Sequence, residues 1–335
     1  MKKFILGLMV AGLIATSQSQ ATAEMVAPTF AANYSILDLP SIPGVPSYYG
    51  GMVFKAGDPN HLLIAGHADQ SNGAIYEIGL IRDANHHVIG FSGTATVFAT
   101  APFIDCGLAY GPGGVLFATG FPGNTLMEFK PGSTSPDKTI ALPISSKSVG
   151  TVGFVPTGYP GAGSIQIGSY TTGGFSTGTL TPDGFGTYDL GPLTAESVPG
   201  RHPEGVEYVP LGSNGFSGPS MLMTEYGTGS SGAIGAYLLN ADGSPNVASR
   251  QDFVTGLHGA NGGAFDPLTN DFFFASFGST YPSNRIVEVQ GFASPRAQGG
   301  GNQSTVPEPS SMALLSLGGI GLAVSAYRRR RAAIV

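Results

Sequence analysis

The chain has 335 residues, of which 52 are glycine and 25 are proline. Both exceed their usual shares of about 7% and 5%, which indicates a fold with many turns. Only 11% of the residues are charged and 41% are hydrophobic, so the chain can bury a core and lacks the charge excess of most disordered proteins. The formal net charge is −6 and no interior segment clusters Lys or Arg, which argues against nucleic acid as a partner. The single cysteine, Cys106, excludes an intramolecular disulfide and a thiolate zinc cage.

The N-terminal residues 1–23 have the pattern of a secretory signal peptide. Lys2 and Lys3 precede an apolar run over residues 4–15, and Ala21 and Ala23 form an A-x-A cleavage site. At 1.5 Å per residue, about 12 apolar residues cross little more than half of a hydrocarbon core that is roughly 30 Å thick. We therefore expect export through the Sec translocon and cleavage after Ala23, rather than an N-terminal membrane anchor.

The C-terminal end carries three unlike elements in a fixed order. The first is a short motif made of Val306, Pro307, Glu308 and Pro309. An apolar stretch follows over residues 310–327, which is just long enough for a transmembrane helix. The third element is a cluster of basic residues, namely Arg328, Arg329, Arg330 and Arg331. Such a cluster holds its end of the helix in the cytoplasm.

This order, over residues 306–331, resembles the PEP-CTERM sorting domain of Gram-negative bacteria. The resemblance implies recognition by an exosortase, a membrane transpeptidase that cleaves at or near the Pro-Glu-Pro motif. It also implies an inner-membrane intermediate, then a place on the outer surface or in the extracellular matrix of a bacterium that makes exopolysaccharide. A plain stop-transfer anchor is the alternative.

Between these two ends we expect one domain over residues 33–290 and a Gly/Ser/Gln-rich tether over residues 291–305. Removing both ends takes away six of the 15 basic and one of the 21 acidic residues, which leaves a net charge of −11. Such an acidic body argues against adhesion to anionic lipid. We therefore expect a monomer that meets the membrane only through the sorting helix.

The body repeats one pattern five times, a small residue followed three positions later by an aromatic residue. The small residues are Gly51, Gly107, Thr151, Gly205 and Gly262. Each is followed by turn residues and by further short β-rich segments, and the starts lie 44 to 57 residues apart. This spacing is close to that of a four-stranded propeller blade. We therefore predict an all-β fold, namely a β-propeller of five blades. A sixth blade is expected only if a degenerate blade lies within residues 155–200. A β-sandwich or right-handed β-helix is the alternative fold.

Fourth strands can be identified after the first four units but not after the fifth. A spare β-rich segment, Tyr34–Leu39, instead precedes the first unit. We predict that this N-terminal strand completes the last blade and closes the ring, which removes the exposed sheet edges.

Polar residues stand just before three of the repeat glycines, where the first strand of each blade would line the central channel. They are Asp105 with Cys106, Glu204 and Asn261, with His202 and His258 close by. Oxygen atoms that converge from separate blades could hold Ca²⁺, which prefers six to eight oxygen ligands. We name Glu204, Asn261 and Asp105 as candidate metal ligands; the alternative is that they cap turns and bond to backbone.

Two of these positions, Glu204-Gly205 and Asn261-Gly262, resemble the metal-binding motifs of the senescence marker protein and gluconolactonase propellers. That resemblance implies a metal, Ca²⁺ or Zn²⁺, and hydrolysis of lactones. The family's remaining Asn and Asp ligands have no counterpart that the sequence alone identifies.

No complete catalytic constellation is present in the sequence. Ser-rich stretches such as residues 227–232 contain no G-x-S-x-G, and the sequence has no P-loop and no G-x-G-x-x-G between a strand and a helix. We expect Cys106 to be a buried thiol. His86 and His87 look like a metal-binding pair, but adjacent side chains on a strand point to opposite faces, so we expect them to lie in a solvated turn. The sequence therefore favours an exported, non-catalytic scaffold or binding module of the extracellular polysaccharide or biofilm matrix, with a metal-dependent lactonase or esterase as the alternative.

Overall fold

A computed structural model describes residues 24–144, 148–194, 201–228, 230–278 and 284–295. Within these residues the chain forms 22 β-strands and two short 3-10 helices, η1 (Pro112–Gly114) and η2 (Val247–Ser249). The predicted signal peptide, the sorting motif and most of the predicted tether lie outside them. None of the helices in this part of the chain is long and apolar enough to cross a membrane.

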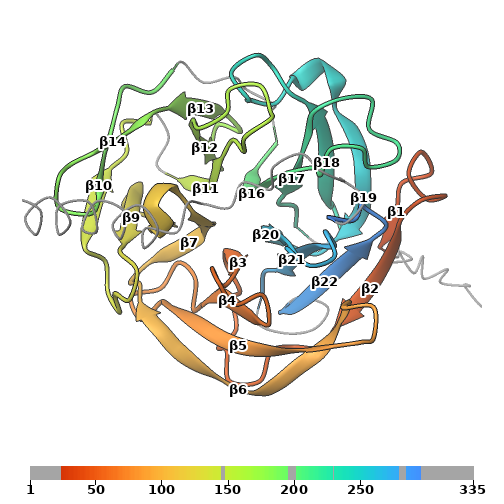
Figure 1. The fold of residues 1–335 in the computed structure, drawn as a ribbon, viewed down its shortest axis with the longest axis horizontal. Coiled ribbons are helices and arrows are strands. Elements are labelled where there is room, and N and C mark those ends of the chain that lie inside the picture. The colour runs from red at the N-terminus through yellow and green to blue at the C-terminus, as the bar shows by residue number, and fades with distance from the viewer. Residues whose placement is uncertain (1–23, 145–147, 195–200, 229, 279–283, 296–335) are drawn as a thin grey trace, which may run out of the picture.

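The strands form five blades arranged around a central axis, as Figure 1 shows. Blade one is made of β3 (Met52–Phe54), β4 (His61–Gly66), β5 (Ala74–Arg82) and β6 (Val88–Thr100). Blade two is made of β7 (Ile104–Tyr110), β8 (Leu116–Gly120), β9 (Thr125–Phe129) and β10 (Lys138–Ala141). Blade three is made of β11 (Val149–Phe154), β12 (Ile165–Ser169), β13 (Phe175–Gly178), β14 (Leu180–Pro182) and β15 (Tyr188–Leu190). Blade four contains β16 (Pro203–Tyr208), β17 (Ser220–Glu225), β18 (Gly232–Leu238) and β19 (Gln251–Leu257), and blade five contains β20 (Ala260–Phe265), β21 (Phe272–Ser276) and β22 (Arg285–Gln290).

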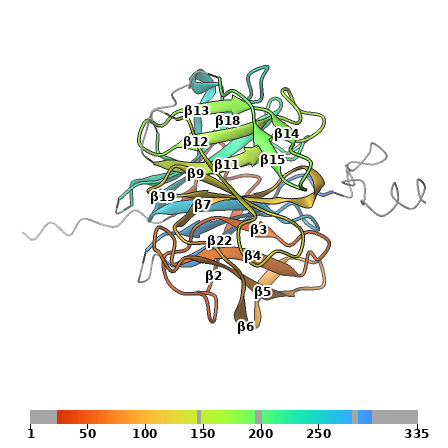
Figure 2. The ribbon, with the colours of Figure 1, turned by 90° about the vertical axis from the view of Figure 1, so that its left-hand side faces the viewer.

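The five-bladed propeller predicted from the repeat is confirmed. Each repeat aromatic residue is the last residue of an innermost strand, at Phe54, Tyr110, Phe154, Tyr208 and Phe265. The innermost strands β3, β7, β11, β16 and β20 pack against one another in that order around the axis. Figure 2 shows the ring from its edge, with β13 and β6 on opposite sides.

The ring is closed by β2 (Ser35–Leu39), as the sequence predicts. This strand pairs antiparallel with β22, in a register that runs from Ser35 opposite Gln290 to Leu39 opposite Ile286. It becomes the outer strand of blade five, so the two ends of the described chain are joined by main-chain hydrogen bonds. A second N-terminal strand, β1 (Met25–Val26), pairs with β19 and adds a fifth strand to blade four. No pattern in the sequence predicted β1.

Residues 155–200 hold no sixth blade in the part that the structure describes. Blade three is interrupted there instead. Its third strand is split at Thr179 into β13, which pairs with β12, and β14, which pairs with β15. The weak pattern of this region in the sequence therefore reflects a broken third strand within one blade.

The core lies between the blades. Five clusters of buried apolar side chains occupy the five interfaces between neighbouring blades. Side chains alternate along each strand, so one strand serves two clusters. On β21, Phe272 and Phe274 face blade four, whereas Phe273 and Ala275 face blade one. The first residues of the predicted tether also contribute, because Phe292 is buried against blades four and five.

Candidate metal centre

The innermost strands bring the predicted ligand residues to one mouth of the central channel. Asp105, Glu204 and Asn261 are each the second residue of their strand, in β7, β16 and β20. All three line a single pocket of about 190 Å³, together with Cys106 and Asp69. The structure thus brings together the three residues singled out in the sequence, and their role as metal ligands remains a prediction.

The polar atoms of this pocket are close together and only partly bonded. Ligand atoms of Asp105, Cys106 and Glu204 all lie within 4.8 Å of one another. The Cys106 thiol donates to Asp105 Oδ1 at 3.1 Å. Asn261 Nδ2 donates a hydrogen bond to the carbonyl oxygen of Tyr49 at 3.3 Å. Asn261 Oδ1 has no hydrogen-bond partner. Glu204 Oε2 also lacks a partner, although Glu204 is only 6% exposed.

Asp69 is a site residue that the sequence reasoning missed. It lies just after β4, in a loop where His67 and Asp69 both adopt positive φ, at 52° and 65°. Its backbone N–H donates to the carbonyl of Ile104 at 2.8 Å, which ties the loop to blade two beside Asp105. Asp69 Oδ1 has no hydrogen-bond partner. Strained backbone of this kind is often found at functional sites. Asp69 was not predicted because it does not precede a repeat glycine.

Four aromatic residues complete the pocket wall, and all occupy the same position in their blades. They are Phe121, Tyr170, Tyr226 and Phe277, each directly after the second strand of its blade. Neighbouring rings meet edge to face, with centroids 5.8 Å apart for Tyr170 and Tyr226 and 6.3 Å apart for Tyr226 and Phe277. In blade one the equivalent position is His67. A sequence search in phase with the second strands would have found this set.

Burial dominates the electrostatics of the pocket. It raises the pKa of Asp105 well above its usual range, and the carboxyls of Glu204 and Asp69 raise it further. Burial also raises the pKa of Glu204 to about 8 and that of Asp69 to about 6. Three carboxyls in one buried pocket disfavour each other's ionisation, and a bound cation would reverse this preference.

The donor set fits a hard divalent cation. Three carboxylates and one amide oxygen are the ligand types that Ca²⁺ prefers, with water able to complete its six to eight positions. Burial and the adjacent carboxyls raise the pKa of the Cys106 thiol well above its ordinary value, so this side chain is expected to stay protonated as a donor to Asp105. That agrees with the buried thiol predicted from the sequence and gives no support to a thiolate nucleophile.

The histidines near the predicted ligands do not line the pocket. His202 stacks on Tyr170, with ring centroids 4.6 Å apart, and its Nδ1 lies 2.8 Å from the Tyr170 carbonyl oxygen. His258 accepts a hydrogen bond at its carbonyl oxygen from Ser276. His86 and His87 lie in a turn, as predicted, at the outer part of blade one.

Comparison with known proteins identifies the C-terminal signal. The model of the PEP-CTERM protein-sorting motif matches residues 305–331, as the sequence predicts. The motif indicates an exported protein that is processed at the membrane by an exosortase and sorted to the cell surface. A search of curated proteins found no match to the chain.

Solved structures similar to the body share little sequence with it. A Trichoderma reesei protein of carbohydrate-active enzyme family AA12 is 12% identical, with 82% of this chain and 99% of that chain covered and a TM-score of 0.44. Regucalcin from Agrobacterium tumefaciens, a calcium-binding protein, is 12% identical, with 77% and 98% covered and a TM-score of 0.44. The pyranose dehydrogenase PQQ domain from Coprinopsis cinerea is 10% identical, with 80% and 97% covered and a TM-score of 0.43.

Proposed function

We propose that this exported propeller is a Ca²⁺-dependent binding module for saccharides of the extracellular polysaccharide matrix. One observation carries the proposal. Buried acceptor oxygens of Asp69, Glu204 and Asn261, from three blades, have no hydrogen-bond partner and belong to one pocket walled by aromatic rings. Unsatisfied buried acceptors are costly, so such a group calls for a ligand that supplies positive charge.

The cation would be held by Asp69, Asp105, Glu204 and Asn261. These side chains supply fewer oxygens than the six to eight that Ca²⁺ takes, so some positions are left for water or for ligand oxygens. Vicinal hydroxyl groups of a sugar are suitable neutral oxygen donors for such positions. The cation would thus connect the acidic pocket to a ligand that carries no positive charge of its own.

The aromatic wall and the pocket volume define the rest of the ligand. Tyr170 and Tyr226 each combine an apolar ring with a polar hydroxyl group, which suits the C–H face and the hydroxyl groups of a sugar ring. A volume of about 190 Å³ is below the usual range of about 300–1,000 Å³ for drug-sized ligands. The pocket therefore suits a single sugar unit or a chain end better than the middle of a polysaccharide.

A metal-dependent lactonase is the second candidate. It is favoured by a specific feature, the presence of three carboxyls at the same pocket, because one of them could act as a general base while the others hold a metal. Hydrolysis would require a water molecule between that base and the ring carbonyl. The Asp69 carboxyl, with a pKa raised to about 6 by burial, is the group best suited to take its proton near neutral pH.

Calcium titration of the full chain in detergent, by calorimetry, tests the cation site. We expect about one strongly bound Ca²⁺ per chain, with affinity reduced at least about tenfold by Glu204→Gln and by Asn261→Ala. Glu207→Gln is a matched control, since Glu207 lies on the same strand but does not line the pocket. Equal Ca²⁺ affinity in the wild type, Glu204→Gln and Glu207→Gln would contradict the proposal.

The saccharide is tested separately, with a panel of mono- and oligosaccharides and with lactones. Tyr226→Ala should keep Ca²⁺ affinity and lose saccharide binding, because it removes only a stacking surface. Binding of sugars that disappears on chelation of Ca²⁺ would support the binding module. Turnover of lactones that requires Ca²⁺ and is lost in Asp69→Asn would instead favour the lactonase.

A further inference from the structure

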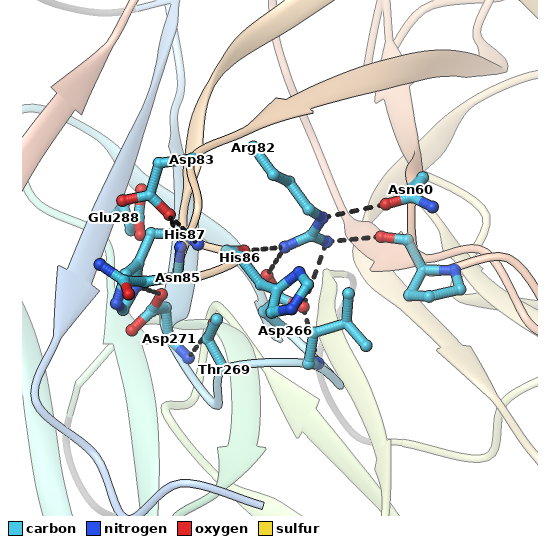
Figure 3. Close-up of polar contacts among 12 residues, drawn as sticks. Asn60, Arg82, Asp83, Asn85, His86, His87, Asp266, Thr269, Asp271 and Glu288 are labelled. Atoms are coloured by element: carbon cyan, nitrogen blue, oxygen red, sulfur yellow. Dashed lines mark hydrogen bonds and ion pairs between the residues drawn. The ribbon is translucent and has the colours of Figure 1, made fainter.

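A second cluster of potential ligands joins blade one to blade five, away from the central pocket. His87 follows β5 in the turn that leads to β6, whereas Asp271 and Glu288 belong to blade five (Figure 3). His87 Nδ1 lies 2.5 Å from Asp271 Oδ2. Ligand atoms of His87, Asp271 and Glu288 all lie within 4.8 Å of one another. One nitrogen and two carboxylate groups thus meet at one point.

The turn that presents His87 is held firmly. Asp83 Oδ1 accepts hydrogen bonds from the backbone N–H groups of Asn85 and His87, both at 2.9 Å. Arg82 donates to the carbonyl oxygen of His86 at 2.6 Å and to Asp266 Oδ2 of blade five at 2.5 Å. These bonds, drawn in Figure 3, fix the turn against blade five. The imidazole of His87 is therefore positioned by its neighbours.

The two carboxylates of the cluster are buried and incompletely neutralised. Glu288 is 0% exposed and Asp271 is 2% exposed. Glu288 Oε1 accepts a hydrogen bond from Gln290 Nε2 at 2.9 Å, but Glu288 Oε2 has no partner. The nearby guanidinium of Arg82 is bonded to Asp266, which is itself fully buried. One imidazole therefore faces two buried carboxyls, an arrangement that is costly unless a further positive charge or a proton is present.

The cluster borders a large pocket. A cavity of about 580 Å³ is lined by His87 and Asp271, with Asn85, Thr269 and Gln290 among its other polar residues. Glu288 does not line this cavity, so it closes the cluster on the buried side. An ion held by the three side chains would have its remaining coordination positions directed toward the cavity.

We infer that His87, Asp271 and Glu288 form a second metal site, for a divalent transition-metal ion such as Zn²⁺. Metal–ligand bonds to histidine and carboxylate groups are about 2.0–2.2 Å long, and the three ligand atoms, all within 4.8 Å of one another, are close enough to share one ion after side-chain adjustment. One imidazole with two carboxylates suits Zn²⁺ or Mn²⁺, whereas the all-oxygen set of the central pocket suits Ca²⁺. Three protein ligands with an open side toward a cavity are the pattern of a site that also binds a small ligand or water.

Zn²⁺ titration of the full chain in detergent, with Ca²⁺ present to fill the central pocket, tests this site. We expect about one tightly bound Zn²⁺ per chain, with affinity lowered by about 100-fold or more in His87→Ala and Glu288→Gln. Gln290→Ala, which removes only the hydrogen bond to Glu288 Oε1, should have a smaller effect of about tenfold. His86→Ala is the matched control and should leave Zn²⁺ affinity unchanged.

Two further measurements separate this site from the central pocket and from loss of folding. Glu204→Gln should leave Zn²⁺ affinity unchanged, and His87→Ala should leave Ca²⁺ affinity unchanged. X-ray absorption at the zinc edge of the wild-type protein should show a first shell of nitrogen and oxygen atoms with about one imidazole. Absence of tight Zn²⁺ binding, or equal loss in His86→Ala and His87→Ala, would overturn the inference and leave a carboxyl pair that shares a proton beside His87.

Discussion

Three of the repeat positions in the innermost strands need glycine because neighbouring inner strands lie very close together. A Cβ atom added at Gly51 would lie 2.7 Å from the Cys106 carbonyl oxygen, and one at Gly107 would lie 2.6 Å from the Val152 backbone nitrogen. At Gly205 the nearest atom would be the Gly262 carbonyl carbon, at 2.6 Å. Each of these glycines therefore packs against the backbone of the next blade. With only five blades around the axis, the inner strands approach too closely for a side chain at this position.

Gly107→Ala should destabilise the propeller by about 1–3 kcal/mol, because the methyl group would force the inner strands of blades two and three apart. Urea unfolding, followed by tyrosine fluorescence or circular dichroism, measures the change. Gly90→Ala is the matched control, since Gly90 also lies in a strand but has nothing within 4 Å of its added Cβ. That variant should be neutral or slightly more stable. Equal stability of the two variants would show that the close approach at Gly107 has no energetic role.

At the scale of elements, β2 differs from the outer strands of blades one and two, which come from their own blade. Outer strands such as β10 only complete their own blade, through pairing with the preceding strand of the chain. In contrast, β2 pairs with β22, which lies about 250 residues later, and so joins the first and last parts of the propeller. The loss of such a strand opens a sheet edge and also the ring.

Replacing Ser35–Leu39 by a Gly/Ser segment of equal length should therefore unfold the body or cause it to aggregate. The same replacement of Lys138–Ala141 in β10 should lower the melting temperature and leave a folded monomer. Circular dichroism and size-exclusion chromatography distinguish these outcomes. A β2 variant that remains monomeric and melts with the β10 variant would contradict a special role for ring closure.

For the whole molecule, the C-terminal motif indicates sorting to the cell surface, and the N-terminal segment is predicted to start export. The carboxylate of Glu24, the residue after the predicted signal cleavage site, pairs with Arg285 of blade five. The same arginine pairs with Asp38 of the closing strand. These ion pairs hold residue 24 and the closing strand against blade five. The sorting motif matches residues 305–331, whereas the last blade strand, β22, ends at Gln290, so cleavage at the motif removes no strand of the propeller.

Mass spectrometry of the exported protein should show a first residue near Glu24 and a last residue near Pro309. Alanine replacement of Pro307, Glu308 and Pro309 should leave the apolar stretch and the arginine cluster on a membrane-bound form, because the exosortase would no longer recognise its site. A variant in the apolar stretch that keeps its hydropathy, such as Leu317→Ile, serves as the control. Extracellular protein that still carries Arg328–Arg331 would contradict the processing.

The sequence by itself determined the five units, the closing strand and three of the pocket residues. It could do so because these features follow a period along the chain. The repeat glycines mark the inner strands, and Asp105, Glu204 and Asn261 stand one or two positions before them. Residues at the same position of each repeat lie at the same height near the propeller axis, so the repeat pattern alone could place these three residues together.

Only the tertiary structure showed the other residues of the central pocket and the contacts between the first and last blades. Asp69 enters the central pocket through a strained loop, and the pattern of the repeat did not indicate that bend. The contact between His87 and Asp271 joins residues 184 positions apart, and it exists because ring closure places blade five beside blade one. The pairing of β1 with β19 of blade four is also a contact between distant parts of the chain. Contacts between the first and last blades follow from the number and tilt of all five blades, which no short segment of sequence encodes.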